Sequence, residues 1–336
     1  MLFALLMFVG TPVFSQNKGK LQIYFVDVEG GQATLFVTPA GESLLIDTGW
    51  AGGNGRDADR IVAAAKKAGI SRIDYVLITH FHMDHVGGVP QLAERIPVGT
   101  FIDHGPNREP SDTSTEQGYE AYQKLLATGK YQHIVAKPGD VLPIKGVTAT
   151  VISADGNLID HPLPGGGEEN SYCKTSETRA ADQSENARSL GILIAFGKLR
   201  ILDLGDLTWD KEMQLMCPIN KLGHVNILVV SHHGVYQSSS PALVDAIHPQ
   251  VAIMDNGAAK GGSKVTLEMF KSVPGLEALW QVHYSEESGP LNTQDAFIAN
   301  PQGPDHGYDL ELTASQDSKF SVLNPRAGVS KTYSAK

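Results

Sequence analysis

Short apolar runs alternate with polar, glycine-containing turns along this chain. The runs at 21–28, 33–38 and 43–47 predict three strands that form an antiparallel meander at the start of a sheet. Residues 57–68 instead place apolar side chains at helical spacing and stop at Gly69, which predicts an amphipathic helix with a glycine cap. The N-terminal part is therefore predicted to be strands followed by a helix.

The alternation of strands and helices continues toward the C-terminus. Further strands are predicted at 73–78, 98–103, 134–135, 141–144, 147–152, 189–196, 199–204, 226–230, 251–254 and 278–283. Helices are predicted at 88–95, 119–127, 241–247 and 265–272, and a final hairpin within 308–323. Because no fixed repeat and no linker divides the pattern, we expect one domain over 20–336.

Two polar stretches interrupt this pattern. Residues 107–118 predict a surface loop, which we expect to overhang the functional site of the domain. Residues 155–188 are longer and contain three consecutive glycines, and loops of this length are usually functional lids or disordered insertions. We therefore treat 155–188 as an insertion in the domain.

Composition narrows the class of protein. The 336 residues are 41% hydrophobic and 19% charged, as in an ordinary globular protein. The net charge of −10 and the pI of about 5.6 argue against passive capture of nucleic acid, which needs a concentrated positive field. A small-molecule substrate is therefore favoured over a nucleic acid, although a local basic groove stays open.

The N-terminus predicts export. Residues 1–15 are mostly apolar and end in small residues, as in a signal peptide cut after Ser15, although no Lys or Arg precedes the apolar run. The mature protein is then expected to be periplasmic or extracellular and to have no membrane segment. The two cysteines, Cys173 and Cys217, would form a disulfide in an oxidising compartment and remain thiols in the cytosol, and the sequence leaves both open.

The densest chemistry lies in Thr79–Gly88, which holds His80, His82, Asp84 and His85 within six residues. Alternate residues of an extended segment point the same way, so His80 and His82 are able to hold one metal ion at the end of a strand. Asp84 and His85 then face a second ion. Three imidazoles and a carboxylate at this spacing predict a metal site.

Other predicted strands end in residues of the same kinds. These strand ends carry Asp47, Asp206, and His232 with His233. Asp47 is expected to orient a metal-bound histidine by accepting its other N–H. His104, which follows the strand at 98–103, is more often structural when it stands alone.

Together these residues resemble the metallo-β-lactamase superfamily: His80-x-His82-x-Asp84-His85, with Asp47 before it and Asp206 and His232 after it. The resemblance covers nearly all of the mature chain. It implies an α/β (α+β) fold, the four-layer αββα sandwich, with the metal site at one edge of two mixed sheets.

Within the superfamily, the chain looks most like the metallo-β-lactamase-like domain of the bacterial DNA-uptake (competence) channel family. The segments that carry this likeness are 25–33, 44–49, 204–206, 231–234 and 238–241, with Asn186 and Ser189. Gln32 stands where that family usually has Asp, which argues against nuclease activity. The chain carries no channel segments, so we do not expect a transport channel.

The resemblance implies metal-assisted hydrolysis with two divalent ions. Nitrogen-rich ligation favours Zn²⁺, while the carboxylates leave Mn²⁺ or Fe open. His80 and His82 are assigned to the first ion, Asp84, His85 and His232 to the second, and Asp206 to the bridge. Asp84, His233 and Asn186 are the expected catalytic residues, with His233 and Asn186 contacting the substrate or orienting a ligand.

Two points stay open from the sequence. Which of His232 and His233 binds metal is undecided. The third histidine of many family members is missing from the first site, where Asn186 is a weak ligand and His104, Glu185 or water would complete the shell.

Three functions compete. A phosphodiester follows from the resemblance and from two-metal chemistry. A carboxylic ester, lactone or β-lactam amide is the alternative, because the fold alone does not exclude it. A non-catalytic metal-binding module is disfavoured by the nearly complete ligand set.

Overall fold

The computed structural model describes residues 19–336, so the export signal expected at 1–15 lies outside the described residues. Two nine-stranded sheets form the centre of the molecule. Among the residues described, no helix has the length and apolar character needed to cross a membrane.

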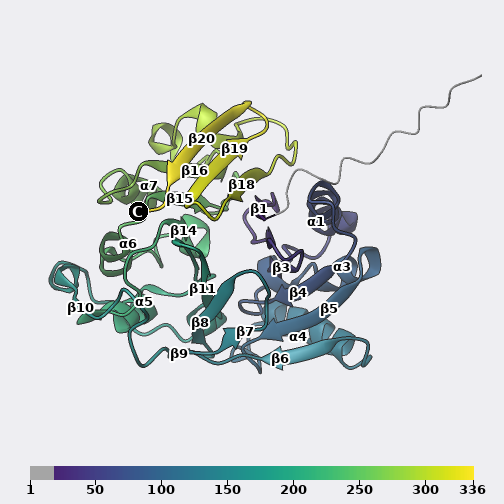
Figure 1. Cartoon of the computed structure of the whole chain (residues 1–336). Coiled ribbons are helices and arrows are strands. Elements are labelled where there is room, and N and C mark those ends of the chain that lie inside the picture. Colours follow the sequence, from purple (N-terminus) through teal and green to yellow (C-terminus); the bar gives the residue numbers. More distant parts are fainter. Residues whose placement is uncertain (1–18) are drawn as a thin grey trace, which may run out of the picture.

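The first sheet has the strand order β20-β19-β18-β1-β2-β3-β4-β5-β6. Strands β3 to β6 are parallel and the remaining pairs are antiparallel. The bounds are β1 Leu21–Phe25, β2 Thr34–Val37, β3 Ser43–Ile46, β4 Ile73–Leu77, β5 Val98–Asp103, β6 Gln132–Val135, β18 Leu310–Ala314, β19 Lys319–Asn324 and β20 Val329–Ser334. The C-terminal strands thus lie in one sheet with the N-terminal ones (Figure 1).

The second sheet has the order β17-β16-β15-β14-β12-β11-β8-β7, with β9 paired to β8. The bounds are β7 Val141–Leu142, β8 Thr148–Ala154, β9 Asn157–Leu158, β11 Gly191–Phe196, β12 Leu199–Asp203, β14 Ile227–Val229, β15 Val251–Met254, β16 Ala278–His283 and β17 Ile298–Asn300. From β12 to β17 the strands are parallel. A separate pair joins β10 (Glu168–Glu169) and β13 (Ile219–Asn220).

Helices cover the outer faces of both sheets. Those of the N-terminal half are α1 Arg56–Lys67, α2 Met83–Val86, α3 Val89–Arg95 and α4 Thr113–Leu126, and those of the C-terminal half are α5 Trp209–Met216, α6 Pro241–Ile247 and α7 Lys264–Phe270. Short 3₁₀ turns lie at η1 Gly53–Gly55, η2 Ser171–Lys174, η3 Glu185–Arg188, η4 Ser231–Gly234, η5 Gly289–Leu291 and η6 Asp295–Phe297. Figure 1 shows α1 and α3 on one side of the strands and α5, α6 and α7 on the other.

Three buried apolar clusters account for this layering. One contains residues of both sheets, such as Ile23 and Ile194, and forms the core between them. The second joins the outer face of the first sheet to α1 and α3 through residues such as Tyr24 and Ile61, and the third joins the second sheet to α5, α6 and α7. Neighbouring residues of one strand, such as Ile23 and Tyr24, enter different clusters because side chains alternate across a strand.

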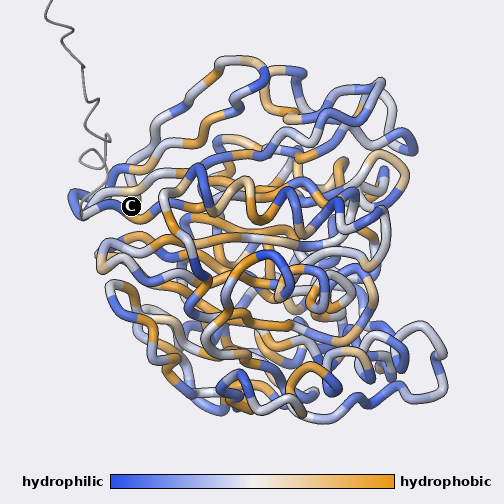
Figure 2. The backbone as a smooth tube through the Cα atoms, turned by 90° about the vertical axis from the view of Figure 1, so that its right-hand side faces the viewer, coloured by the Kyte–Doolittle hydropathy of each residue, from blue (hydrophilic) through white to orange (hydrophobic). Residues whose placement is uncertain are grey.

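The apolar segments gather in the middle of the molecule and the hydrophilic ones at its outer loops (Figure 2). Burial of apolar area is the main driving force for folding. The expected αββα sandwich is confirmed.

The loop expected at 107–118 is shorter than the sequence suggested. Helix α4 begins at Thr113 rather than at 119, because the Asp112 side chain accepts a hydrogen bond from Thr115 N and caps the helix there. Helix α5 and the last strand, β20, were not predicted, and neither was β17.

The insertion at 155–188 has little regular structure and is tied to the rest of the chain. Cys173 and Cys217 form a disulfide, with their Cα atoms 5.8 Å apart. Close by, the Asn170 side chain donates hydrogen bonds to Met216 O and Ala242 O, at 3.0 and 2.8 Å. These contacts hold the middle of the insertion against α5 and α6.

Candidate metal centre

The functional side chains come from strand ends that meet at one edge of the two sheets. Asp47 follows β3 and His80 follows β4, which are parallel neighbours in the first sheet. Asp206 follows β12 and His233 follows β14, which are parallel neighbours in the second sheet. The carboxyl ends of parallel strands lie at the same edge, where open α/β sheets bind their ligands.

Four side chains form a compact cluster at this edge, with ligand atoms within 4.8 Å of one another: Asp84, His85, Asp206 and His233. Asp84 Oδ2 lies 3.3 Å from His85 Nε2 and 3.2 Å from His233 Nε2. Asp206 reaches the same imidazoles, through Oδ2 to His85 Nε2 at 3.3 Å and through Oδ1 to His233 Nε2 at 3.5 Å. Two carboxylates and two imidazoles thus aim at one small volume.

A second group of side chains also faces Asp206. Its Oδ2 lies 3.4 Å from His232 Nε2 and 3.9 Å from His80 Nε2. The Asn186 amide nitrogen lies 3.5 Å from the same His232 nitrogen. Asp206 therefore stands between two sets of imidazoles, as the sequence-based assignment of a bridge requires.

The structure separates the positions of the two adjacent histidines. The sequence-based prediction grouped His232 with Asp84 and His85, but His233 is the member of the pair that lies with them. His232 lies instead on the side of His80 and Asn186.

His82 lies beside His80, with ring centres 4.7 Å apart, but it is not a member of the compact cluster. Its Nε2 is 3.1 Å from Glu109 Oε2, and 24% of its side chain is exposed. The assignment of His82 to the first ion stays a prediction, and Glu109 is a partner that sequence reasoning missed.

His104 and Glu185, the two candidates for completing the first site, are paired with each other. His104 Nε2 lies 3.0 Å from Glu185 Oε2, and both side chains are fully buried. Glu185 also accepts hydrogen bonds from the backbone nitrogens of Phe81 and Arg108, at 3.2 and 2.6 Å. The pair links the segments that carry Phe81, Arg108 and Glu185, and these contacts occupy both Glu185 oxygens.

Asp47 orients the site in the way the sequence predicted. Its Oδ2 lies 2.7 Å from His85 Nδ1, while the backbone N–H and the hydroxyl of Thr79 donate to its two oxygens at 2.8 and 2.7 Å. A His85 that donates through Nδ1 presents the lone pair of Nε2 to the cluster. His80 is held similarly, with Nδ1 3.1 Å from Thr79 Oγ1.

We expect Asp47→Asn to lower metal affinity by about 10- to 100-fold, because the amide no longer fixes the proton on His85 Nδ1. Competition with a chromogenic chelator measures the affinity. Asp74→Asn is the matched control, since Asp74 binds Ser43 on the same sheet, away from the cluster. Equal affinities for wild type and Asp47→Asn would contradict the orienting role.

Backbone strain marks the same residues. Asp47, His232 and His233 have φ angles of 59°, 55° and 53°, in the left-handed region that residues with a Cβ rarely adopt. Such conformations persist only where surrounding contacts enforce them, and they gather at functional sites. Here the hydrogen bond from His232 N to Gly205 O, 3.0 Å long, ties the strained turn to the strand end that carries Asp206.

The electrostatics of the cluster favour a cation. Burial alone would raise the pKa of Asp206, but His232, His85 and His233 hold that pKa well below its usual range. Burial opposes the charged imidazoles, yet Asp206 raises the pKa of His233 to about 10, and Asp206, Asp84 and Asp47 raise the pKa of His85 well above its usual range. The two carboxylates thus attract positive charge to this volume, which a bound metal ion would supply.

The imidazoles of the second group, His232 and His80, favour the neutral form. Burial lowers the pKa of His232 to about 4 against the attraction of Asp206, and burial lowers the pKa of His80 well below its usual range. Neutral imidazole is the form that binds metal.

The donor set fits divalent metal ions. His80 Nε2 and Asp206 Oδ1 are buried without a hydrogen-bond partner, which is costly for polar atoms unless a ligand completes them. The Nε2 atoms of His85 and His233 are only 3.2 Å apart, a spacing that suits two ligands of one ion. Imidazole and carboxylate together are typical ligands of zinc and related metals.

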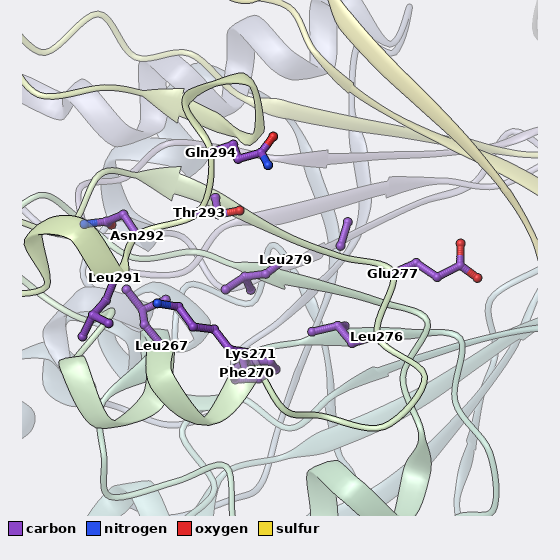
Figure 3. A pocket seen from close by; sticks show the side chains of 11 residues that line it. Leu267, Phe270, Lys271, Leu276, Glu277, Leu279, Leu291, Asn292, Thr293 and Gln294 are labelled. Carbon is purple, nitrogen blue, oxygen red and sulfur yellow. The ribbon is translucent and has the colours of Figure 1, made fainter.

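A groove lies elsewhere on the surface. It has a volume of about 280 Å³ and lies between Leu267 and Phe270 of α7 and the segment 291–294 (Figure 3). None of the metal-centre residues described above lines it, so we assign the chemistry to the His/Asp cluster and not to this groove.

The N-terminal half of the chain matches a known protein family. Residues 26–169 match the model of the metallo-beta-lactamase superfamily, while Asp206 and His233 lie beyond the matched range. The fold and the site define a class of metal-dependent hydrolases. The chain carries a metallo-β-lactamase superfamily domain.

The chain is similar to several curated proteins, of which three are described here. It is 27% identical over 243 residues to Recombination protein 2 of Haemophilus influenzae, covering 72% of this chain and 25% of that protein. It is 32% identical over 105 residues to a hydroxyacylglutathione hydrolase of Stenotrophomonas maltophilia, covering 31% of this chain and 37% of that protein. It is 23% identical over 270 residues to a UPF0173 metal-dependent hydrolase of Cupriavidus metallidurans, covering 79% and 82%.

The chain therefore spans less than half the length of the first two relatives. The similarity to Recombination protein 2 agrees with the expected relationship to the DNA-uptake channel family.

Proposed function

We propose that this protein is a hydrolase that uses two divalent metal ions to cleave a phosphodiester-type substrate. The observation that supports this most directly is the position of Asp206 between two sets of imidazoles. Its Oδ1 faces His233, and its Oδ2 lies within 3.4 Å of both His85 and His232, so this carboxylate is within reach of both sets and suited to bridge two ions.

We assign Asp84, His85 and His233 to one ion, because their ligand atoms lie together with Asp206. We assign His80 and His232, with His82 as a further ligand, to the other. Bound there, two divalent ions would lower the pKa of a water toward neutrality and stabilise charge on the attacked centre.

The chain itself contributes orientation and hydrogen bonding. Asp47 holds the proton on His85 Nδ1 and keeps its Nε2 directed into the cluster. Asn186, whose Oδ1 is buried without a partner and whose Nδ2 lies next to His232, is placed to donate an N–H to a substrate oxygen. Nitrogen-rich ligation favours Zn²⁺, with Mn²⁺ and Fe as alternatives.

The second candidate is hydrolysis of a carboxylic ester, lactone or β-lactam amide. One finding favours an acyl substrate: over 105 residues, the chain is similar to a protein named hydroxyacylglutathione hydrolase. The phosphodiester is favoured by the relationship to Recombination protein 2, which extends over more of the chain. The acidic composition and Gln32 make DNA the less favoured phosphodiester.

A substrate panel with metal analysis tests the proposal. We expect the purified protein to bind close to two ions per chain and to cleave a chromogenic phosphodiester faster than a chromogenic ester or a cephalosporin. Cleavage of the ester alone would reject the phosphodiester in favour of the acyl alternative. Fewer than one tightly bound ion per chain, with no activity after adding zinc or manganese, would reject the hydrolase altogether.

We further propose that the protein is exported, as residues 1–15 predict. The Cys173–Cys217 disulfide supports this, because structural disulfides persist mainly in oxidising compartments.

A further inference from the structure

Asp255 is a buried carboxylate beside the metal centre, and it belongs to none of the sequence motifs that predicted the site. It directly follows β15, and only 5% of the residue is exposed. Neither of its oxygens accepts a hydrogen bond from any residue within 19–336. Burying a carboxylate without partners costs free energy, and native proteins rarely leave such a group unsatisfied. No hydrogen bond within the described structure therefore accounts for the burial of Asp255.

The group that faces this carboxylate is an imidazole of the metal centre. Asp255 Oδ1 lies 3.6 Å from His233 Nδ1, and that nitrogen is also buried without a hydrogen-bond partner among the residues described. The other nitrogen of the ring, Nε2, faces Asp84 and Asp206 at 3.2 and 3.5 Å. Asp255 and the compact cluster thus face different nitrogens of one imidazole. Asp255 is accordingly not a member of the cluster that would hold the ion.

Two adjacent strands bring these side chains together. Asp255 follows β15 and His233 lies in the turn after β14, and the two strands are parallel neighbours in the second sheet. The side chain of the next residue, Asn256, donates to His283 O at 2.8 Å and ties the end of β15 to β16. In the loop that follows, Gly262 N donates to His233 O at 2.8 Å. Contacts on both sides therefore hold the carboxylate and the imidazole opposite each other.

The positive charge carried by this loop is engaged elsewhere. Lys260, between β15 and α7, places its ammonium group in contact with Asp84 Oδ2. The oxygens of Asp255 have no such partner in the part of the chain that the structure describes. His233 is then the polar side chain toward which Asp255 is directed.

The first sheet shows the same arrangement with the hydrogen bond formed. Asp47 follows β3, and its Oδ2 lies 2.7 Å from His85 Nδ1. The Nε2 atoms of His85 and His233 face each other across the cluster, 3.2 Å apart. Asp47 also accepts two hydrogen bonds from Thr79, whereas Asp255 has no second partner within residues 19–336. The only contact that distinguishes Asp255 is thus the one with the imidazole.

The chemistry of a ligand histidine supplies the missing hydrogen bond. With Nε2 as the metal-binding atom, a neutral imidazole carries its single proton on Nδ1. For His233, the acceptor that faces this N–H is Asp255 Oδ1. The present 3.6 Å exceeds an ordinary N–H···O distance, at most about 3.2 Å, by an amount that a side-chain rotation covers. A carboxylate in this position fixes the direction of the ring and strengthens it as a ligand.

We propose that Asp255 is a positioning residue of the metal centre, which accepts the Nδ1–H of His233 and keeps Nε2 directed at the site shared with Asp84, His85 and Asp206. The inference rests on the proposed two-metal function, and it assigns to each sheet one carboxylate that orients one ligand imidazole. Asp255 touches neither the substrate nor the ion.

Stepwise competition with a chromogenic chelator tests this role without turnover. We expect Asp255→Asn to bind one of two Zn²⁺ ions about 10- to 100-fold more weakly, because a neutral amide is a weaker acceptor than a carboxylate. The other ion should keep its affinity. The weakened ion should be the one that Asp84→Ala loses, since Asp84 contacts the same His233 nitrogen. Equal affinities of wild type and Asp255→Asn for both ions would overturn the proposal.

Asp210→Asn is the matched control. Asp210 is also a buried aspartate with an oxygen that lacks a hydrogen-bond partner among the described residues, but it lies in α5 and its Oδ1 accepts from Thr208. Both ions should bind to this variant as they do to wild type. A loss of affinity as large as that of Asp255→Asn would show a general effect of buried aspartates and overturn the specific role of Asp255.

Unfolding of the metal-free protein separates positioning from a structural role. Asp255 makes no hydrogen bond within the described residues, so metal-free Asp255→Asn should unfold at the same urea concentration as metal-free wild type or at a higher one. A lower midpoint with unchanged metal affinity would make Asp255 a structural residue and contradict the inference.

Nuclear magnetic resonance of the wild-type protein provides a test that needs no Asp255 variant. In Zn²⁺-loaded protein labelled with ¹⁵N-histidine, the His233 signals are assigned by their loss in His233→Gln. We expect the ring proton on Nδ1 and the metal on Nε2. A proton on Nε2 of His233 in the loaded protein would overturn the proposal.

These measurements also distinguish the positioning role from the hydrolase function. Weaker binding of one ion to Asp255→Asn, together with no turnover of any substrate by wild type, would keep the role of Asp255 and reject the hydrolase. Hydrolysis by wild type with unchanged metal affinity in Asp255→Asn would keep the hydrolase and reject the role. A wild-type protein that binds no metal would reject both.

Discussion

Replacing Asp206 by alanine is expected to abolish hydrolysis, with kcat/KM falling about 10³-fold or more. Asp206 contacts imidazoles of both groups, His233 through Oδ1 and both His85 and His232 through Oδ2. Its removal deprives both proposed ions of a ligand. It also removes a negative charge that raises the pKa of His85 and of His233.

Metal content separates this variant from its neighbour in the cluster. Metal analysis of Asp206→Ala should show the loss of both ions, whereas Asp84→Ala should keep the ion held by His80 and His232, because Asp84 contacts only the other set. Circular dichroism checks that each variant is folded. Two retained ions in Asp206→Ala would contradict the bridging role, whatever the activity.

The disulfide is expected to have the largest effect on stability. Cys173 and Cys217 are 44 residues apart, and loop-closure entropy for a loop of this length corresponds to about 4 kcal/mol of unfolding free energy. We therefore expect the double variant Cys173→Ser/Cys217→Ser to unfold at a markedly lower urea concentration. The insertion at 155–188 should also become more accessible to proteases, because the bond joins it to the end of α5.

The effect on catalysis should be small by comparison. The disulfide packs against the apolar cluster under α5 and α6, which does not include the metal-centre residues. Metal stoichiometry and kcat/KM of the folded double variant should stay near wild type. Wild type treated with a phosphine reductant is the matched control and should unfold like the variant. An unchanged urea midpoint in both would show that the bond does not stabilise the fold.

Much of the fold could be predicted from the sequence, because burying one face of a strand or helix imposes a regular spacing of apolar residues. The strand predicted at 98–103 has those bounds in the structure, and the helix predicted at 57–68 is shifted by a single residue. Helix α5 was missed because it is short and its first turn contains Asp210 and Glu212, both of which are buried. Their burial depends on neighbours from elsewhere: Glu212 accepts hydrogen bonds from the backbone of Ser239 and Ser240.

The candidate site, too, could be predicted only in part from the sequence. The spacing of His80, His82, Asp84 and His85 points to a metal, since these residue types are close in sequence whatever the fold. Lys260 gave no such signal, because a single lysine in a glycine-rich stretch is ordinary, and its contact with Asp84 spans 176 residues of sequence.

The sequence by itself determined the class of fold, the edge at which the site lies and the kind of chemistry, because strand periodicity and the histidine motif are local. Only the tertiary structure decided which histidine joins which group. His232 and His233 both have positive φ angles, so no strand or helix period indicates which way either side chain points. Their directions follow from contacts with Gly205 and with the loop that carries Lys260, which come together only when the second sheet is assembled.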